Sequence, residues 1–349
     1  MQTVRTILSV ILLSTITVGA DPQTAPTDSL TTDTIAQTHK PSLAKRLDTK
    51  LTKSYYKQKY DTNYVVRPKQ KWLLRFLGNY AGNNIHAKGT VNDIYSKYDL
   101  HTRRNTSVSL EANYCNLFVA LSLNPDKIKG IYDDYELNLE YHGNMISIDF
   151  NYLRATSLTG DIKLGNIDHL DEEGLRMNVV NASAYYIFNH RKFSYPAAFY
   201  QNYYQLRSAG SWLAGISVQS GSIKTTDELK ARSLLAPEVH LTFANVALGG
   251  GYGYNFVFGK HSQWLFHLSA LPSAVLYKHN KLTVNNEEMR DNRMCFNMIF
   301  NERASVVYHF SPRLNTGASL IMSNSIYDNG DIKLNQNKYL ARAFIGFRL

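Results

Sequence analysis

The sequence predicts an all-β protein: a closed antiparallel transmembrane β-barrel of about 12 strands, with about 10 as the alternative. Polar and apolar residues alternate from Asp134 to His142, and successive side chains of a strand point to opposite faces, so this segment has one polar and one apolar face. Many alternating segments reach the roughly 9–11 residues that a membrane-spanning strand needs. The 24 Tyr and 15 Phe suffice for aromatic girdles at both membrane boundaries.

The N-terminus predicts export. Arg5 precedes an apolar run from Ile7 to Val18, and Val18-Gly19-Ala20 follows. A basic start, a short apolar core and small residues before the cut are typical of a signal peptide, so we expect residues 1–20 to be removed after Ala20. The alternative, an N-terminal membrane anchor, needs a longer apolar core. We therefore expect the mature protein in the cell outer membrane.

Two segments separate the signal peptide from the barrel. Residues 21–41 are rich in Thr, Asp, Pro and Gln, and we expect a disordered linker. Residues 42–71 form a basic periplasmic segment, in which leucines spaced by four predict a short amphipathic helix ending near Tyr56: Leu43, Leu47 and Leu51. This segment is either a solvated linker or a contact for anionic phosphate groups of the inner leaflet or cell wall.

The barrel is expected over residues 72–349. Tight turns at Cys115-Asn116 and Gly143-Asn144 join neighbouring strands. An even number of strands places both barrel ends in the periplasm, and the long connections near 160–174, 190–208 and 225–243 are then expected outside the cell. The expected strands are 72–88, 106–114, 117–123, 134–142, 145–157, 175–189, 209–224, 244–259, 263–283, 293–310, 314–327 and 335–349.

The C-terminal strand has a clear phase. Its outward face is expected to be Tyr339, Ala341, Ala343, Ile345, Phe347 and Leu349. The opposite face holds Lys338, Arg342, Gly346 and Arg348. A last strand that ends on the last residue, with an aromatic beside it, is typical of segments that barrel-assembly machinery recognises, although Leu349 replaces the usual Phe. The expected partners are this machinery, through Tyr339 to Leu349, and outer-membrane lipids.

Charge and cysteine content narrow the function classes. The formal net charge is +10, but residues 1–75 hold 12 Lys and Arg against 5 Asp, so the excess belongs to one segment and not to the barrel. An exported protein of this kind is not expected to bind nucleic acid. Cys115 and Cys295 are expected to be free thiols, with no metal-ligand spacing and no cofactor. A soluble secreted β-sandwich binding protein also alternates and is the alternative fold.

Charged residues on the inward faces predict a network in the lumen. Early strands contribute acids and late strands contribute bases, and the last strand of a closed barrel pairs with the first. The network consists of Glu111, Glu136, Glu140, Asp149, Arg303, Arg342 and Arg348. It is either a set of ion pairs that fills a narrow interior or a charged constriction that selects solutes. Glu302 falls on the apolar face, and we expect a β-bulge to turn it inward.

We expect no catalytic residues, although two short motifs invite an enzymatic interpretation. Barrel lipid hydrolases pair His and Ser two residues apart on a strand, and this spacing occurs at His267/Ser269 and His309/Ser311. His267 and Ser269 are expected to point into the lumen, away from lipid, so a lipid-modifying esterase is the alternative function. The run Gly249 to Tyr254 lacks the register of a phosphate loop; its glycines allow bending of the strand or the close approach of another backbone.

Two stretches resemble a known family: Tyr60 to Trp72, and Arg191 to Phe199 leading to Ser208-Ala209-Gly210-Ser211. They are similar to domain-of-unknown-function family 4421, uncharacterised exported proteins of Gram-negative bacteria, over about residue 55 to the C-terminus. The resemblance implies a location in the outer membrane and no reaction. Together these observations predict a non-enzymatic outer-membrane β-barrel, structural or with a narrow pore, that carries extracellular loops.

Overall fold

The computed structural model describes residues 43–349 except 58, 92–93, 116, 131–133, 165–166, 233–237, 286, 292–296 and 329–331. The expected signal peptide, the linker and Cys295 lie outside the described residues. Cys115 is a buried free thiol.

Four helices lie among the described residues: α2 (Leu43–Tyr56), α3 (Pro125–Ile128), α4 (Tyr195–Phe199) and α5 (Asp227–Arg232). The helix expected in the basic segment is α2, and it ends at Tyr56 as its leucine spacing predicts. None of the helices described is long and apolar enough to cross a membrane. In α4, Ser194 caps the N-terminus by accepting a hydrogen bond from the Ala197 amide, and Pro196 occupies the first turn.

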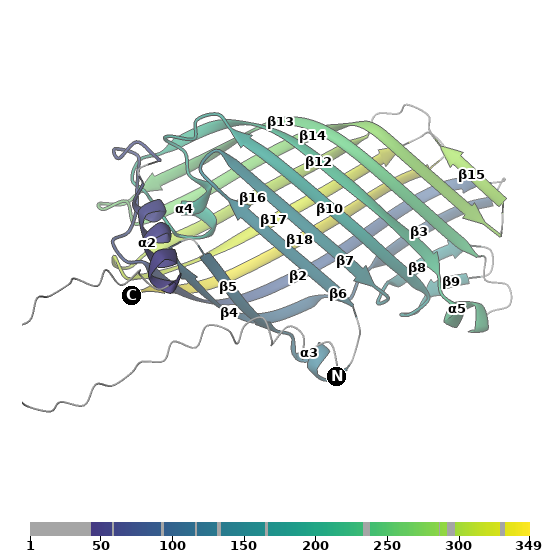
Figure 1. The fold of residues 1–349 in the computed structure, drawn as a ribbon. Coiled ribbons are helices and arrows are strands. Elements are labelled where there is room, and N and C mark those ends of the chain that lie inside the picture. The colour runs from purple at the N-terminus through teal and green to yellow at the C-terminus, as the bar shows by residue number, and fades with distance from the viewer. Residues whose placement is uncertain are drawn as a thin grey trace, which may run out of the picture. The chain divides into compact units, whose positions relative to one another are not determined.

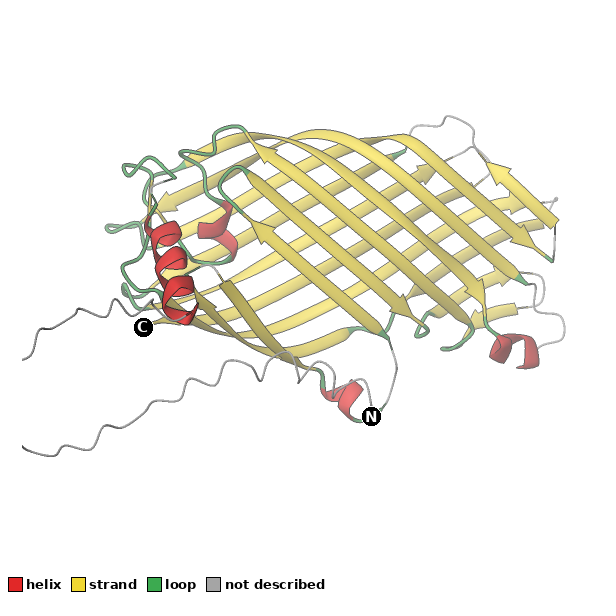
Figure 2. Ribbon diagram, viewed as in Figure 1, coloured by secondary structure: helices red, strands yellow, loops and turns green. Residues whose placement is uncertain are grey.

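Strands make up most of the described chain (Figure 2). They are β1 (Val65–Val66), β2 (Trp72–Val91), β3 (Ile94–His101), β4 (Asn105–Tyr114), β5 (Leu117–Leu123), β6 (Tyr135–His142), β7 (Ile146–Ala155), β8 (Thr159–Leu164), β9 (Ile167–Leu170), β10 (Leu175–Ile187), β11 (Tyr204–Gln205), β12 (Ala209–Thr225), β13 (Val239–Phe258), β14 (Trp264–Val284), β15 (Glu287–Asp291), β16 (Met298–His309), β17 (Leu314–Asp328) and β18 (Ile332–Arg348).

Within the described residues, 16 of these strands form one antiparallel sheet, and β1 and β11 form a separate two-stranded one. Every one of the expected strand ranges overlaps a strand of the large sheet. The strands β3, β8, β9 and β15 were not expected from the sequence. The sheet therefore divides into more strands than the expected 12.

The sheet curls so that its last strand pairs with its first (Figure 1). The β18·β2 ladder runs from Ile332 opposite Gly89 to Arg348 opposite Leu73. At the strand ends away from the termini, β3 pairs with β8, which follows β7 in the chain. Nearer the termini, the described parts of β5 and β6 each have one partner strand, β4 and β7 respectively. Among the described residues, no ladder joins β5, β8 or β9 to β6 or β7, so the row of paired strands ends at these elements.

The two faces of the curled sheet differ in the way the alternation predicts. The outer face exposes aliphatic and aromatic side chains such as Leu110, Leu139 and Trp212, whereas Ser109, Glu111 and Ser147 are buried on the enclosed face. Aromatic residues gather toward the strand ends near the termini: Trp72, Phe76, Phe188, Trp212, Tyr252, Phe256, Phe258, Trp264, Phe310 and Phe347. Such a belt is typical of a barrel wall at a membrane boundary.

The expected bulge at Glu302 is absent. Glu302 lies opposite Ala270 on one side and Met322 on the other, with unbroken register in both ladders. Its side chain therefore stays on the outer face, where the carboxylate accepts a hydrogen bond of 2.8 Å from Asn324 Nδ2. Glu302 therefore finds its hydrogen-bond partner, Asn324, on the outer face and needs no bulge to turn it inward.

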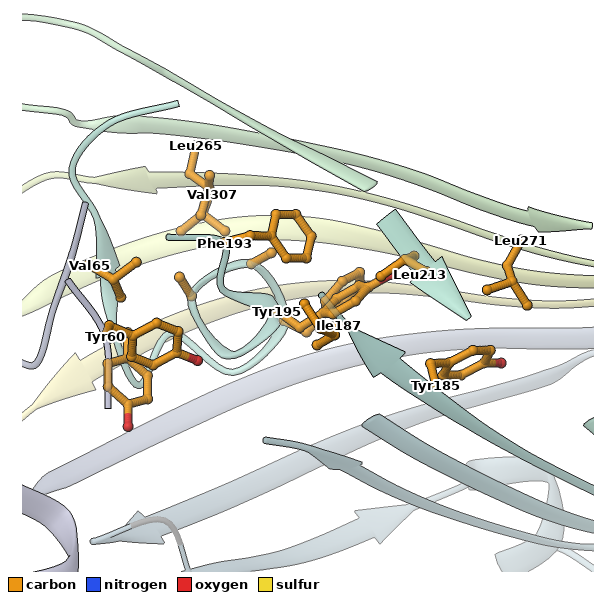
Figure 3. Packing of buried hydrophobic residues seen from close by; sticks show 14 of the residues in the cluster. Tyr60, Val65, Tyr185, Ile187, Phe193, Tyr195, Leu213, Leu265, Leu271 and Val307 are labelled. Atoms are coloured by element: carbon orange, nitrogen blue, oxygen red, sulfur yellow. The ribbon is translucent and has the colours of Figure 1, made fainter. Parts of the chain in front are cut away.

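Apolar clusters fill the enclosed space at both ends. Near the termini, the connection between β10 and β12 (residues 188–208, here called the folded-in loop) packs Phe193 and Tyr195 against wall residues such as Leu265 and Val307 (Figure 3). At the opposite end, residues around β8 and β9 pack with the wall: Ile85, Leu100, Leu153, Leu158, Ile162, Leu170, Met177 and Val179. The enclosed space is thus apolar at both ends, with a polar layer between them.

The folded-in loop corrects an expectation. The sequence assigns the connection near 190–208 to the same side as those near 160–174 and 225–243. The structure places it at the opposite strand ends, beside the start of β2 and the end of β18 (Figure 1). The segment 160–174 is also mostly strand, because it forms β8 and β9. Length alone misled the assignment, since an inward-folding segment can be as long as a surface loop.

Candidate functional site

The polar layer of the enclosed space is built from ion pairs that join distant strands. Glu140 of β6 accepts two hydrogen bonds from Arg342 of β18, at 2.7 and 2.9 Å. Asp149 of β7 pairs with Arg303 of β16. Because β6 and β7 are not ladder neighbours of β18 and β16, these pairs run across the enclosed space, which is therefore narrow at this level.

Two further ion pairs use bases that the sequence analysis left out of the network. Glu111 makes a bidentate pair with Arg75 of β2, at 3.1 and 2.6 Å. Glu136 lies 3.5 Å from Lys338 Nζ. The run Trp72 to Leu77 is apolar on both faces, so its phase could not reveal that Arg75 points inward. Lys338 shares the enclosed face of the last strand, and only the fold shows which acid it meets.

Arg348 has a different role from the one expected. It is buried, and among the described residues it pairs with no carboxylate; its guanidinium donates to the Gln201 carbonyl at 2.8 Å and to the Tyr204 hydroxyl at 2.5 Å. Each of the four acids in the predicted network therefore pairs with a base, and two of these bases, Arg303 and Arg342, belong to the predicted network. Arg348 binds the folded-in loop instead.

A cavity of about 90 Å³ lies in the polar layer. Its lining combines the Glu140 and Arg303 side chains with amides and hydroxyls: Asn138, Asn151, Asn181, Ser183, Gln219, Asn301, Ser323, Ser325 and Gln336. The volume suits a few water molecules, which amide and hydroxyl groups bind well. Within the described residues, no cluster of His, Cys, Asp and Glu has the arrangement of a metal site.

Wall residues hold the folded-in loop through its backbone and side chains. Arg75 donates to the Phe199 carbonyl and to Gln201 Oε1, each at 2.8 Å. Asn113 Nδ2 donates to Asn202 Oδ1 at 2.6 Å. The Arg75 guanidinium therefore binds both Glu111 of the sheet and the folded-in loop.

The expected His–Ser spacing gains a third member in the structure. Asn255 Nδ2 donates to the Ser194 carbonyl and to Gln205 Oε1, so its Oδ1 faces His267 Nδ1 at 2.7 Å. The Asn255 oxygen can only accept, so Nδ1 of His267 carries the proton and Nε2 is free to accept from Ser269 Oγ at 3.0 Å. This arrangement of Ser, His and an orienting amide is one that activates a nucleophile.

The burial of these three residues argues against a role of Ser269 as a nucleophile. Asn255 and His267 are fully buried and Ser269 is 9% exposed. The Tyr195 hydroxyl donates to Ser269 Oγ at 3.0 Å, and burial raises the pKa of Tyr195, so that this phenol stays protonated. Ser269 is not among the residues that line the polar cavity. At the other spacing, Ser311 Oγ accepts hydrogen bonds from the Arg313 and Leu314 amides in a turn, and within the described residues no hydrogen bond joins it to His309.

The glycine run on β13 lies close to a neighbouring backbone at Gly251, where an added Cβ would meet the Ala270 carbonyl, and close to a side chain of the folded-in loop at Gly253. A Cβ on Gly253 would lie 3.0 Å from the Phe193 ring of the folded-in loop and 3.1 Å from Ser269 Cβ. Because Gly253 has no side chain, the folded-in loop can pack closely against the enclosed face of the sheet at this position.

A curled antiparallel sheet with an apolar, aromatic outer face and a polar, ion-paired interior defines a membrane β-barrel type of protein. The chain belongs to the family described as a domain of unknown function (DUF4421), whose model matches residues 59–349. This confirms the resemblance seen in the sequence. No curated protein matches the chain.

The solved structures to which the chain is similar include the following outer-membrane proteins. The outer membrane protease OmpT from Escherichia coli has 7% identity, with 81% of this chain and 99% of that chain covered and a TM-score of 0.36. The outer membrane protein OprG from Pseudomonas aeruginosa has 9% identity, coverage of 83% and 99%, and a TM-score of 0.28. The translocator domain of autotransporter NalP from Neisseria meningitidis has 8% identity, coverage of 88% and 95%, and a TM-score of 0.32.

Proposed function

We propose that the protein is a non-enzymatic, closed barrel of the outer membrane whose interior is sealed, so that its role is structural and not that of an open pore. The observation that carries this proposal is the filling of the enclosed space by apolar clusters at both ends. Between them lie a cavity of about 90 Å³ and, beside Glu136 and Lys338, a smaller one of about 20 Å³. The aromatic belt on the outer face supports the membrane location.

The orientation follows from the same proposal. The start of β2 and the end of β18 lie at the same strand ends as the folded-in loop. A barrel of this class with an even number of strands has both of its ends in the periplasm, so the strand ends near β8, β9 and β15 face outward from the cell. The basic segment containing α2 is then periplasmic.

Planar bilayers test whether the interior is sealed. We expect the full-length mature protein, purified from the outer-membrane fraction, to show no resolvable channel, because ions cannot cross the two apolar clusters without moving them. An open porin inserted into the same bilayer is the control. Discrete, reproducible openings of the wild-type protein would contradict a sealed interior and would favour the narrow-pore alternative.

The Asn255–His267–Ser269 arrangement supports a second candidate, a lipid-modifying esterase with Ser269 as nucleophile. We rank it second because Ser269 is enclosed beneath Tyr195, on the face opposite to membrane lipid.

An assay of phospholipid and short acyl-ester hydrolysis separates the two candidates. We expect the wild type and Ser269→Ala to release fatty acid at the same background rate. Ser273→Ala is the matched control, because Ser273 is a buried serine on the enclosed face of the same strand. Hydrolysis by the wild type that Ser269→Ala abolishes and Ser273→Ala retains would reverse our ranking.

A further inference from the structure

Four lysines lie side by side on the outer face of the sheet, at the strand ends away from the termini. Lys333 of β18 is opposite Lys88 of β2, Lys88 is opposite Lys97 of β3, and Lys97 is opposite Lys163 of β8. All four side chains are exposed. We call these four residues the lysine row.

The lysine row is an unfavourable arrangement for the protein by itself. Residues directly opposite each other on adjacent strands have Cβ atoms about 4.5–5.5 Å apart, and like charges in such pairs repel. Asp328 offsets the repulsion at Lys333, because its carboxylate lies 2.7 Å from Lys333 Nζ. Within the part of the chain that the structure describes, the other three have no ion-pair partner.

The two nearby acids form no ion pair with the lysine row in the part of the chain that the structure describes. Asp99 and Asp161 lie on the same face, two residues along β3 and β8 from the lysines. Asp99 pairs with His86 at 2.9 Å and Asp161 with His169 at 3.4 Å. The row therefore presents four ammonium groups over about 14 Å at the usual spacing of neighbouring strands, and of these only Lys333 has an ion-pair partner among the described residues.

The position of the row indicates which anion reaches it. Along the outer face of β2, aromatic residues end at Tyr80, and Lys88 follows after polar positions. Lys88 lies eight residues beyond Tyr80, and eight residues of a tilted strand correspond to roughly 20 Å along the barrel axis. The lysines point sideways from the wall and not upward from a loop tip. A ligand in the plane of the membrane, with anionic groups above its acyl region, fits this placement better than a ligand arriving from the medium.

We propose that the lysine row binds the phosphate groups of a neighbouring phosphorylated glycolipid of the outer leaflet. The phosphates take the place of the missing counter-charges, and several lysines at strand spacing engage more than one anionic group at once. This inference rests on the proposed outer-membrane location and adds a lipid-binding surface to it.

Thermal unfolding of the purified full-length protein in neutral detergent tests the proposal without depending on cellular location. We expect lipopolysaccharide to raise the unfolding midpoint of the wild type, and its phosphatase-treated form to raise it much less. In Lys88→Gln/Lys97→Gln, the half-saturating lipopolysaccharide concentration should rise at least about tenfold, and added salt should weaken wild-type binding because the contact is ionic. Lys281→Gln is the matched control, since Lys281 is an exposed lysine at the same strand ends that already pairs with Glu288 at 2.7 Å.

A second measurement separates binding from folding. Without ligand, the midpoint of Lys88→Gln/Lys97→Gln should equal or exceed that of the wild type, because a repulsion is removed. Equal lipopolysaccharide affinity in the double variant and the wild type would overturn the proposal. Inositol hexakisphosphate, a soluble polyphosphate, is the remaining probe; if it binds the wild type as tightly as lipopolysaccharide does, the row recognises a soluble anion and the lipid assignment is wrong. Failure of outer-membrane fractionation would instead count against the proposed function.

Discussion

Replacing Arg75 by Met is expected to lower the free energy of unfolding by about 3–5 kcal/mol, the usual cost of removing one partner of a buried ion pair. Arg75 is 3% exposed and makes the bidentate pair with Glu111. It also donates to the Phe199 carbonyl and to Gln201. The variant leaves a buried carboxylate without its cation and a loop carbonyl without its donor, and methionine can restore neither.

Urea unfolding in lipid vesicles measures this effect, with Arg104→Met as the matched control. Arg104 is an exposed arginine on the outer face that donates to the Tyr80 and Tyr339 hydroxyls, so its loss should cost about 1 kcal/mol or less. Limited proteolysis should also cut the folded-in loop faster in Arg75→Met than in the wild type. Equal stability of the Arg75 and Arg104 variants would show that Arg75 is hydrated and does not hold the loop.

The second large effect is expected at Glu140. Glu140→Leu leaves Arg342 without its carboxylate in an interior where the two side chains are 13% and 21% exposed. We expect a loss of about 3–5 kcal/mol in the free energy of unfolding, toward the lower figure because the polar cavity adjoins Glu140. A lumen filled with water would screen the charge and reduce the loss to about 1 kcal/mol or less.

The double variant Glu140→Leu/Arg342→Met makes this prediction specific. It removes both charges at once, so most of the lost stability should return, since apolar replacement of a buried pair is often neutral or better. Double-mutant analysis of urea unfolding gives the coupling energy directly. Additive losses in the two single variants would mean that Glu140 and Arg342 do not act as a pair. Labelling of Glu140→Cys by a lipid-phase probe would show that position 140 of β6 faces the lipid and not the enclosed space.

Local alternation carried most of the fold prediction. The clean phase of residues 134–142 placed Glu136 and Glu140 on the enclosed face, and the last strand's phase did the same for Arg342. These assignments held because a strand's side chains alternate whatever its partner, and water or lipid decides which face is which. The prediction is wrong at Glu302, because Asn324 on the same face supplies a hydrogen bond and the register stays unbroken. It is also wrong for the 190–208 connection, because a long connection can fold inward.

By itself, then, the sequence determined the class of fold, the ranges and facing of the long strands, the helix at Leu43–Tyr56 and the family. Only the tertiary structure decided that Arg75 meets Glu111, that Asn255 orients His267, that residues 188–208 fold inward and that four lysines from four strands form one row. The physical reason is distance along the chain. Alternation is a property of a few consecutive residues, whereas Glu140 and Arg342 are separated by 202 residues and meet only through the strand order of the curled sheet.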